Sequence, residues 1–331
     1  MGSLPFTIEA ALAAQSASPA IIDGHIHLFD KTRPGGSPYP PDPPPGKAPD
    51  QGWSALPARY RSVVKPFGVV GTVVVEASPL VEDNQWLLDQ AAADSIIVGV
   101  VGYLDPGSPD FGTHLERFRK NTLYRGIRHR QTGANVSLAE GIQQPQFMAN
   151  LKLLADAGLS LDTYSRQQTT DSSTVLVRIA DKVPSLRIIV DHLPGVRLPE
   201  ERADHDAFVA GLAELGKRPQ VYIKLSEVVR SVNGQVSTDL SIYRDWLDKL
   251  WTPFGEDHVL YGSDWPNSES VEPNSYPNIM NVARAYVTGK GVAAVKKVFS
   301  QNSAAAYGVL GRWGGPAVGW PITAIPLTGP V

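Results

Sequence analysis

Cysteine is absent from this sequence of 331 residues. Disulfide bonds, thiolate metal sites and a cysteine nucleophile are therefore excluded, and His, Asp and Glu remain as the side chains able to bind a metal. The absence says nothing about compartment, because a protein without cysteine is compatible with either redox environment.

A charge excess and a long apolar run are also missing. The 30 basic and 33 acidic residues give a net charge of -3, without the basic surplus of a nucleic-acid-binding protein. No stretch approaches the roughly 18 apolar residues that cross a bilayer. Residues 7–18 are rich in alanine but carry Glu9 where a signal peptide carries positive charge. We expect a cytoplasmic protein that binds neither nucleic acid nor membrane, unless an export signal has been removed.

What the sequence does contain is a regular alternation of apolar runs and amphipathic stretches. Hydrophobic residues make up 42% of the chain and charged residues 19%, which is typical of a globular protein with a large core. The expected strands are residues 21–30, 71–77, 96–104, 124–130, 159–164, 186–192, 221–226 and 258–264. The expected helices are residues 55–67, 81–93, 111–121, 146–157, 173–183, 206–215, 239–250, 279–287 and 292–307.

Eight strands separated by helices predict parallel pairing through right-handed crossovers. Eight such units close a (β/α)8 TIM barrel, whereas a doubly wound sheet more often stops at five to seven strands. We therefore predict an α/β protein with a single barrel domain over residues 20–310. Residues 1–19 are expected to form an N-terminal extension and residues 311–331, rich in Gly and Pro, a C-terminal tail.

A segment rich in proline and glycine follows the first strand. Residues 31–49 contain the run Pro43-Pro44-Pro45-Gly46 near their end, which excludes helix and central strand. We expect either a loop that covers the end of the first strand or a solvated insertion.

The first strand carries two histidines, His25 and His27, separated by Ile26. Because side chains alternate along a strand, the two imidazoles must lie on one face and Ile26 on the other. Two imidazoles on one face can bind a metal or a polarised oxygen. The alternative is a buried strand whose histidines only hydrogen-bond to neighbours.

Polar residues also stand at the ends of other apolar strands, where desolvation would disfavour them without a function. In a parallel barrel these ends form the active site. The residues concerned are His25, His27, Glu76, Arg128, His129, Arg130, Asp162, Tyr164, Arg166, His192, Lys224, Ser226 and Asp264. Convergence of so many polar groups is difficult to explain by structure alone.

The sequence resembles the amidohydrolase superfamily and, within it, the amidohydrolase-related (amidohydrolase 2) TIM-barrel lactone hydrolases, which include sugar lactonases and 2-pyrone-4,6-dicarboxylate lactonase. The likeness is carried by residues 23–30 (DGHIHLFD), 126–129 (GIRH), 190–195 (VDHLPG), 224–226 (KLS) and 261–266 (YGSDWP). These motifs run in family order across nearly the whole chain.

The resemblance implies that Asp264 is the catalytic base, that His25 and His27 are metal or substrate ligands, and that His192 is the sixth-strand histidine. The fourth strand departs from binuclear members, because it ends in Arg128-His129-Arg130 in place of a carboxylated lysine. We therefore expect either one divalent ion, zinc before others, or none. Glu76 would complete a metal site with His25, His27 and Asp264, or would instead pair with an arginine.

Opening a lactone requires a deprotonated water, a polarised carbonyl and a group that holds the ring. Asp264 can take the proton, and a metal or the histidines, His192 among them, can polarise the carbonyl. Arginine forks bind carboxylates, so an acidic or hydroxylated substrate is expected at the residues Arg128, Arg130, Tyr164, Arg166 and Lys224. The alternative for each arginine is an ion pair with Asp162 or Glu227.

The predicted function is hydrolysis of a lactone of a sugar acid or a dicarboxylate, with a small molecule as the partner. A metal-dependent decarboxylase of an aromatic or unsaturated acid is the first alternative, and a non-catalytic small-molecule-binding barrel is the second. The sequence leaves the substrate undefined, because it is selected by loops. The sequence also leaves undefined whether the protein forms a homo-oligomer.

Overall fold

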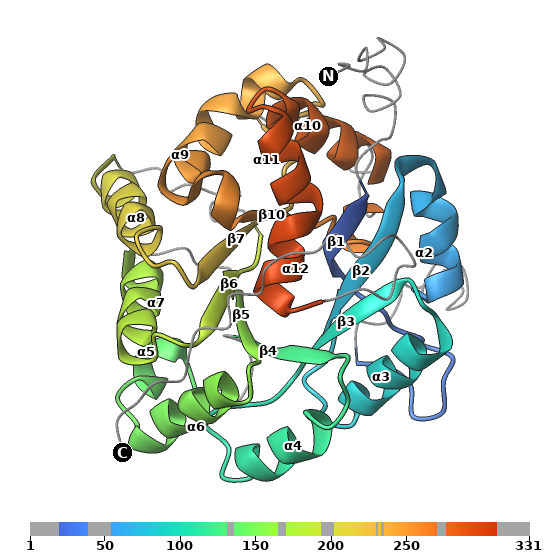
Figure 1. Cartoon of the computed structure of the whole chain (residues 1–331), viewed down its shortest axis with the longest axis vertical. Helices are drawn as coiled ribbons and strands as arrows, with labels where there is room; N and C mark the ends of the chain where they lie inside the picture. The colour runs from blue at the N-terminus through green and yellow to red at the C-terminus, as the bar shows by residue number, and fades with distance from the viewer. Residues whose placement is uncertain are drawn as a thin grey trace, which may run out of the picture.

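The computed structural model describes residues 20–38, 54–130, 136–164, 170–192, 202–229, 231–232, 235–269 and 276–309. Eight parallel strands form one sheet in chain order, and helices surround it (Figure 1). The strands are β1 (Ile21–Ile26), β2 (Val69–Val75), β3 (Ile97–Gly102), β4 (Tyr124–Arg130), β5 (Ser160–Tyr164), β6 (Arg187–Val190), β7 (Val221–Leu225) and β10 (Val259–Tyr261). A small antiparallel ribbon pairs β8 (Ser231–Val232) with β9 (Gln235–Val236).

The sheet closes where the chain beyond β10 meets β1. Asp264 N donates to the carbonyl of His25 at 2.9 Å, and His27 N donates to the carbonyl of Trp265 at 2.7 Å. Ile26 and Trp265 form a parallel bridge. The predicted (β/α)8 TIM barrel is therefore confirmed, and the carboxyl ends of all eight strands share one rim.

The helices between the strands follow the apolar periodicity of the sequence. They are α2 (Pro57–Val64), α3 (Asp83–Ala93), α4 (Phe111–Phe118), α5 (Leu138–Gly141), α6 (Pro145–Asp156), α7 (Thr170–Lys182), α8 (Arg202–Leu215), α9 (Leu240–His258), α10 (Tyr276–Thr288), α11 (Val292–Lys296) and α12 (Asn302–Tyr307). Three single turns complete the set: η1 (Lys65–Phe67), η2 (Asn267–Glu269) and the π-helical η3 (Lys297–Gln301). Among the described residues, no helix is both long and apolar enough to span a membrane.

A bulge in β1 decides which side chains enter the barrel. Between Asp23 and Ile26, β1 has one residue more than the β2 segment it pairs with. The extra residue reverses the alternation, so Asp23 faces the helices, where its carboxylate accepts from the hydroxyl of Tyr60 at 2.9 Å. His25 and His27 then face the interior together, and Ile26 packs in the outer layer.

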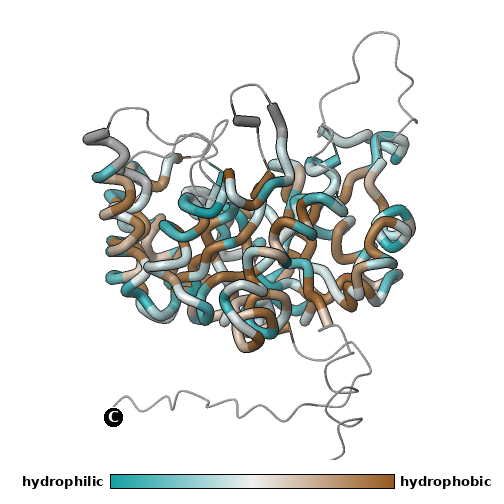
Figure 2. Tube along the Cα trace, turned by 90° about the horizontal axis from the view of Figure 1, so that it is seen from above, coloured by the Kyte–Doolittle hydropathy of each residue, from teal (hydrophilic) through white to brown (hydrophobic). Residues whose placement is uncertain are grey.

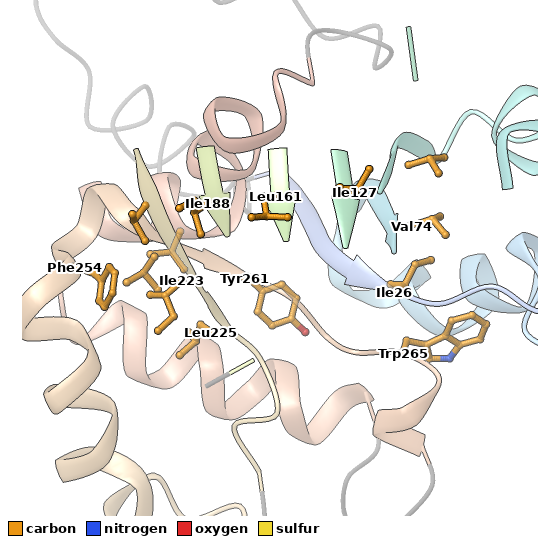
Figure 3. Close-up of a cluster of buried hydrophobic side chains, with 14 of the residues drawn as sticks. Ile26, Val74, Ile127, Leu161, Ile188, Ile223, Leu225, Phe254, Tyr261 and Trp265 are labelled. Carbon is orange, nitrogen blue, oxygen red and sulfur yellow. The ribbon is translucent and has the colours of Figure 1, made fainter. Parts of the chain in front are cut away.

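The core has an outer and an inner part. The outer part lies between strands and helices and includes Ile127, Leu161 and Ile188, which come from neighbouring strands (Figure 3). The inner part fills the barrel and includes Val73 of β2 together with Tyr307 of α12, a helix that crosses the ring of strands in Figure 1. Apolar segments run through the middle of the molecule and hydrophilic ones along its edges (Figure 2).

Several predicted segments fall wholly or partly beyond the described residues. The extension 1–19, the tail 311–331 and Arg166 lie outside them, and only residues 31–38 of the proline-rich segment lie inside. The domain limits 20–310 therefore stay a prediction.

Candidate functional site

His25 of β1, His27 directly after this strand and an aspartate beyond β10 meet at the carboxyl end of the barrel. The Nε2 atoms of His25 and His27 are 3.2 Å apart. Oδ1 of Asp264 lies 3.6 Å from Nε2 of His25 and 3.2 Å from Nε2 of His27. All three side chains are buried. The imidazoles thus share a face, as their spacing predicts, with the aspartate across from them.

Two site residues have a left-handed backbone conformation that sets the direction of their side chains. His192 has a φ of 58° and Asp264 a φ of 57°, a conformation that Asp and His adopt more readily than most residues. In a regular strand the adjacent Asp191 and His192 would face opposite sides. The turn at His192 breaks that alternation, so Asp191 lies 3.4 Å from the His25 ring nitrogen while the His192 ring lies 4.6 Å from the His25 ring.

A fully buried lysine lies beneath the histidines. Nζ of Lys224, on β7, is 2.7 Å from Oδ2 of Asp162, 2.7 Å from Oδ1 of Asp191 and 2.9 Å from Nδ1 of His25. The hydroxyl of Tyr307 donates to the same Oδ2 of Asp162 at 2.6 Å. Lys224 is therefore connected to the site through two aspartates and His25. Its own side chain has no exposed surface.

Glu76 at the end of β2 is held by two arginines of β4. Nε of Arg128 donates to Oε1 of Glu76 at 2.7 Å, and a terminal nitrogen of Arg130 lies 3.3 Å from Oε2. Arg128 also lies 3.5 Å from Asp191. Of the two roles open to Glu76, the structure shows the ion pair with arginine. The partners of Arg128 are Glu76 and Asp191, and not the expected Asp162 or Glu227.

His192 and Tyr164 form another wall of the site. Nδ1 of His192 is 3.1 Å from the hydroxyl of Ser226, and the two rings of His192 and Tyr164 meet edge to face at 5.3 Å. Tyr164 is only partly buried, so it lies nearer the rim. His129 instead packs against Phe147 of α6, in the helix layer where strand alternation places it.

The buried carboxylates differ in their affinity for protons. Burial alone would raise the pKa of Asp191, but Lys224 and then His25 hold it well below its ordinary value. Burial likewise opposes ionisation of Asp264, yet His192 and His27 keep its pKa below the usual range. Asp264 is therefore a carboxylate at neutral pH. Burial raises the pKa of Asp162 to about 6, although Lys224 opposes the shift.

The atoms at the centre of the site match the spacing of metal ligands. Ligands 2.0–2.1 Å from a tetrahedral zinc ion lie about 3.3 Å from one another, close to the 3.2, 3.2 and 3.6 Å among His25, His27 and Asp264. Ligand atoms of His25, His192 and Asp264 also lie within 4.8 Å of one another. Imidazole nitrogen and carboxylate oxygen suit zinc. Glu76 is not in this group.

One site residue, Asp191, was missing from the set expected from the sequence. Asp162 was expected at the end of the fifth strand, but the only partner expected for it was an arginine. The signal for Asp191 was present, since a carboxylate directly after the apolar run of β6 is costly to bury without a partner. Its partner, Lys224, is on another strand.

A parallel barrel with buried histidines at the end of its first strand and an aspartate after its last strand has these polar groups at the strand ends, where TIM-barrel enzymes hold their active sites. The amidohydrolase family model matches residues 22–309. The chain therefore belongs to the amidohydrolase family.

Other proteins resemble the chain in sequence and in structure. An L-fucono-1,5-lactonase from Burkholderia ambifaria is 29% identical over 61% of this chain and 66% of its own length. The crystal structure of an amidohydrolase from Burkholderia multivorans with bound zinc has a TM-score of 0.73 at 20% identity, covering 88% of this chain and 100% of that one. A putative 2-pyrone-4,6-dicarboxylic acid hydrolase from Pseudomonas putida has a TM-score of 0.66 at 22% identity, covering 88% and 98%.

Proposed function

We propose that this protein hydrolyses the lactone of a sugar acid whose ring carries hydroxyl groups and no additional carboxylate. The observation that carries the proposal is the buried carboxylate of Asp264 within 3.6 Å of His25 and His27. Membership of the amidohydrolase family and the likeness to an L-fucono-1,5-lactonase support lactone hydrolysis.

In the proposed reaction Asp264 accepts a proton from water as the water oxygen bonds to the lactone carbonyl carbon. The imidazoles of His25 and His192 face the charge that develops on the carbonyl oxygen. The ring C–O bond then breaks, and Asp264 returns its proton to the leaving oxygen, which gives a hydroxy acid. A divalent ion held by His25, His27, His192 and Asp264 would polarise the carbonyl as a Lewis acid.

The charge pattern favours a neutral substrate over a dicarboxylate. Among the described residues of the site, each cation has an acidic partner: Arg128 and Arg130 contact Glu76, and Lys224 contacts Asp162 and Asp191. A substrate carboxylate would have to compete with these buried pairs. Hydroxyl groups carry no charge, so their binding at the rim, where Tyr164 lies, leaves the pairs intact.

The substrate class is tested by measuring hydrolysis of a panel of lactones. We expect kcat/KM for neutral 1,4- and 1,5-lactones of sugar acids to exceed that for 2-pyrone-4,6-dicarboxylate by at least about tenfold, about 1.4 kcal/mol of transition-state binding. Release of carbon dioxide from aromatic acids is measured beside it. Decarboxylation without lactone opening would overturn the proposal in favour of the decarboxylase alternative.

The catalytic role is tested by Asp264→Asn. Asparagine accepts the left-handed backbone at this position but removes the base, so we expect kcat to fall about 10³-fold with unchanged circular dichroism. Asp257→Asn, which alters an exposed carboxylate of α9, is the matched control and is expected to keep full activity. Activity retained in Asp264→Asn would remove the aspartate from the mechanism, and absence of turnover in the unaltered protein would favour a binding barrel.

A further inference from the structure

The ammonium group of Lys224 hydrogen-bonds to Asp162 and to Nδ1 of His25 and forms an ion pair with Asp191. Its Nζ faces Asp162, Asp191 and the Nδ1 atom of His25 at 2.7, 2.7 and 2.9 Å. The side chains of Lys224, Asp162 and Asp191 have no exposed surface. Water therefore does not compete for the contact between the lysine and the histidine.

This contact fixes where the proton of His25 resides. Nζ of Lys224 lies within hydrogen-bond distance of Nδ1 of His25, at 2.9 Å. An ammonium group only donates hydrogen bonds. Nδ1 of His25 must therefore accept, and the single proton is on Nε2.

The neighbouring histidine fits that arrangement. Nδ1 of His27 lies 2.9 Å from the carbonyl oxygen of Val75, which can only accept. Nδ1 of His27 therefore carries a proton, and this histidine does not compete with Lys224 for Nδ1 of His25. Nε2 of His25 lies 3.2 Å from Nε2 of His27 and 3.6 Å from Oδ1 of Asp264, so a proton on Nε2 of His25 faces the centre of the site.

A metal ligand would need the opposite tautomer of His25. A histidine that binds a metal through Nε2 donates its Nδ1–H to a carboxylate or carbonyl. Oδ1 of Asp191 lies 3.4 Å from this Nδ1 and could accept it, but the ammonium of Lys224 is nearer. Lys224 thus opposes metal binding at a set of atoms that otherwise has the right spacing.

We propose that Lys224 is a positioning residue that holds His25 as the Nε2–H tautomer, so that His25 donates a hydrogen bond toward the substrate carbonyl and binds zinc poorly. The part that concerns the substrate rests on the proposed lactone hydrolysis. The part that concerns the tautomer and zinc does not.

The tautomer is measured directly in the unaltered protein. Long-range ¹H–¹⁵N correlation spectra of protein labelled with ¹⁵N-histidine distinguish a protonated from an unprotonated ring nitrogen, and loss of a signal in His25→Gln assigns His25. We expect Nε2 protonated and Nδ1 unprotonated. A protonated Nδ1 would overturn the proposal whether or not the protein hydrolyses lactones.

The effect on metal binding is measured with Lys224→Met. Without the ammonium, Nδ1–H of His25 can donate to Asp191, and we expect zinc affinity, measured by competition with a chelating dye, to rise about tenfold or more. Lys152→Met, which alters an exposed lysine of α6, should leave it unchanged. Unaltered zinc affinity in folded Lys224→Met would refute the role of the lysine. If that variant does not fold, the spectrum of the unaltered protein decides the matter.

Discussion

Asp23 illustrates how one buried side chain can affect the stability of the protein. Its carboxylate lies behind β1, accepts from Ser263 N at 2.9 Å and from the hydroxyl of Tyr60 at 2.9 Å, and is wholly buried. Burial raises its pKa to about 6 against the pull of these hydrogen bonds. Asp23 thus links β1 to the chain segment that follows β10, at some cost in desolvation.

The raised pKa of Asp23 determines whether the stability of the protein rises or falls with pH. Because the pKa is higher in the folded state, the folded protein binds more protons between pH 4 and 6, and its free energy of unfolding falls as the pH rises. Asp23→Asn removes this dependence. We expect the free energy of unfolding of the unaltered protein, relative to the variant, to fall by about 2 kcal/mol from pH 4.5 to 7.5. Urea unfolding at both pH values measures it, and parallel pH profiles would contradict it.

The strands that carry the site leave no room around His25. Gly262 follows β10 and lies beside β1, where an added Cβ would be 2.7 Å from Cβ of His25. Such a separation is too short for two carbon atoms, so one strand would have to move. The glycine permits the close approach of the first and last strands that brings Asp264 to the histidines.

Gly262→Ala is expected to displace His25 and to lower kcat for lactone hydrolysis by about tenfold to a hundredfold, because small misplacements of catalytic groups are costly. Gly112→Ala is the matched control, since an added Cβ in α4 meets its nearest atom only at 4.0 Å. Alanine there should leave kcat unchanged and stabilise the helix by about 0.5–1 kcal/mol. Steady-state kinetics of both variants test this, and equal kcat values would argue against the tight fit.

The barrel as a unit depends on its last helix. Tyr307 of α12 is fully buried inside the ring of strands and donates its hydroxyl to Asp162, which in turn contacts Lys224. The inner core thus continues from the helix at the amino ends of the strands to the charged groups below the histidines.

The domain limits predict which truncations the protein tolerates. We expect a chain of residues 20–310 to unfold with a midpoint within a few degrees of the full chain and to keep its activity. A chain of residues 20–301 lacks α12, loses Tyr307 from the inner core and should fail to fold cooperatively, since removing a large buried aromatic side chain alone costs about 3–5 kcal/mol. Thermal unfolding followed by circular dichroism distinguishes the two. Cooperative folding of the shorter chain would show that the helix is dispensable.

Much of this architecture can be predicted from the sequence because it depends on local patterns. Apolar runs of strand length alternate with helical periodicity eight times, which leads to the barrel. The spacing of His25 and His27 places both rings on one side of β1. The rule that parallel strands share a carboxyl end brings Asp264 to them.

The partners of the charged groups could not be predicted in the same way. Arg128 is beside Asp162 in the register of β4 and β5, yet its guanidinium extends to Glu76, directly after β2. The left-handed backbone at His192 also turns this histidine to the same side as its neighbour Asp191. Neither result follows from spacing along the chain.

The sequence by itself determined the strands, their number and the residue types at their ends, because hydrophobic periodicity and side-chain alternation act over a few residues. The tertiary structure alone decided that Lys224 donates to His25 and that Glu76 binds arginines in place of the metal-ligand group. Barrel closure sets these distances between distant strands, and burial without water makes each charge depend on the nearest opposite charge.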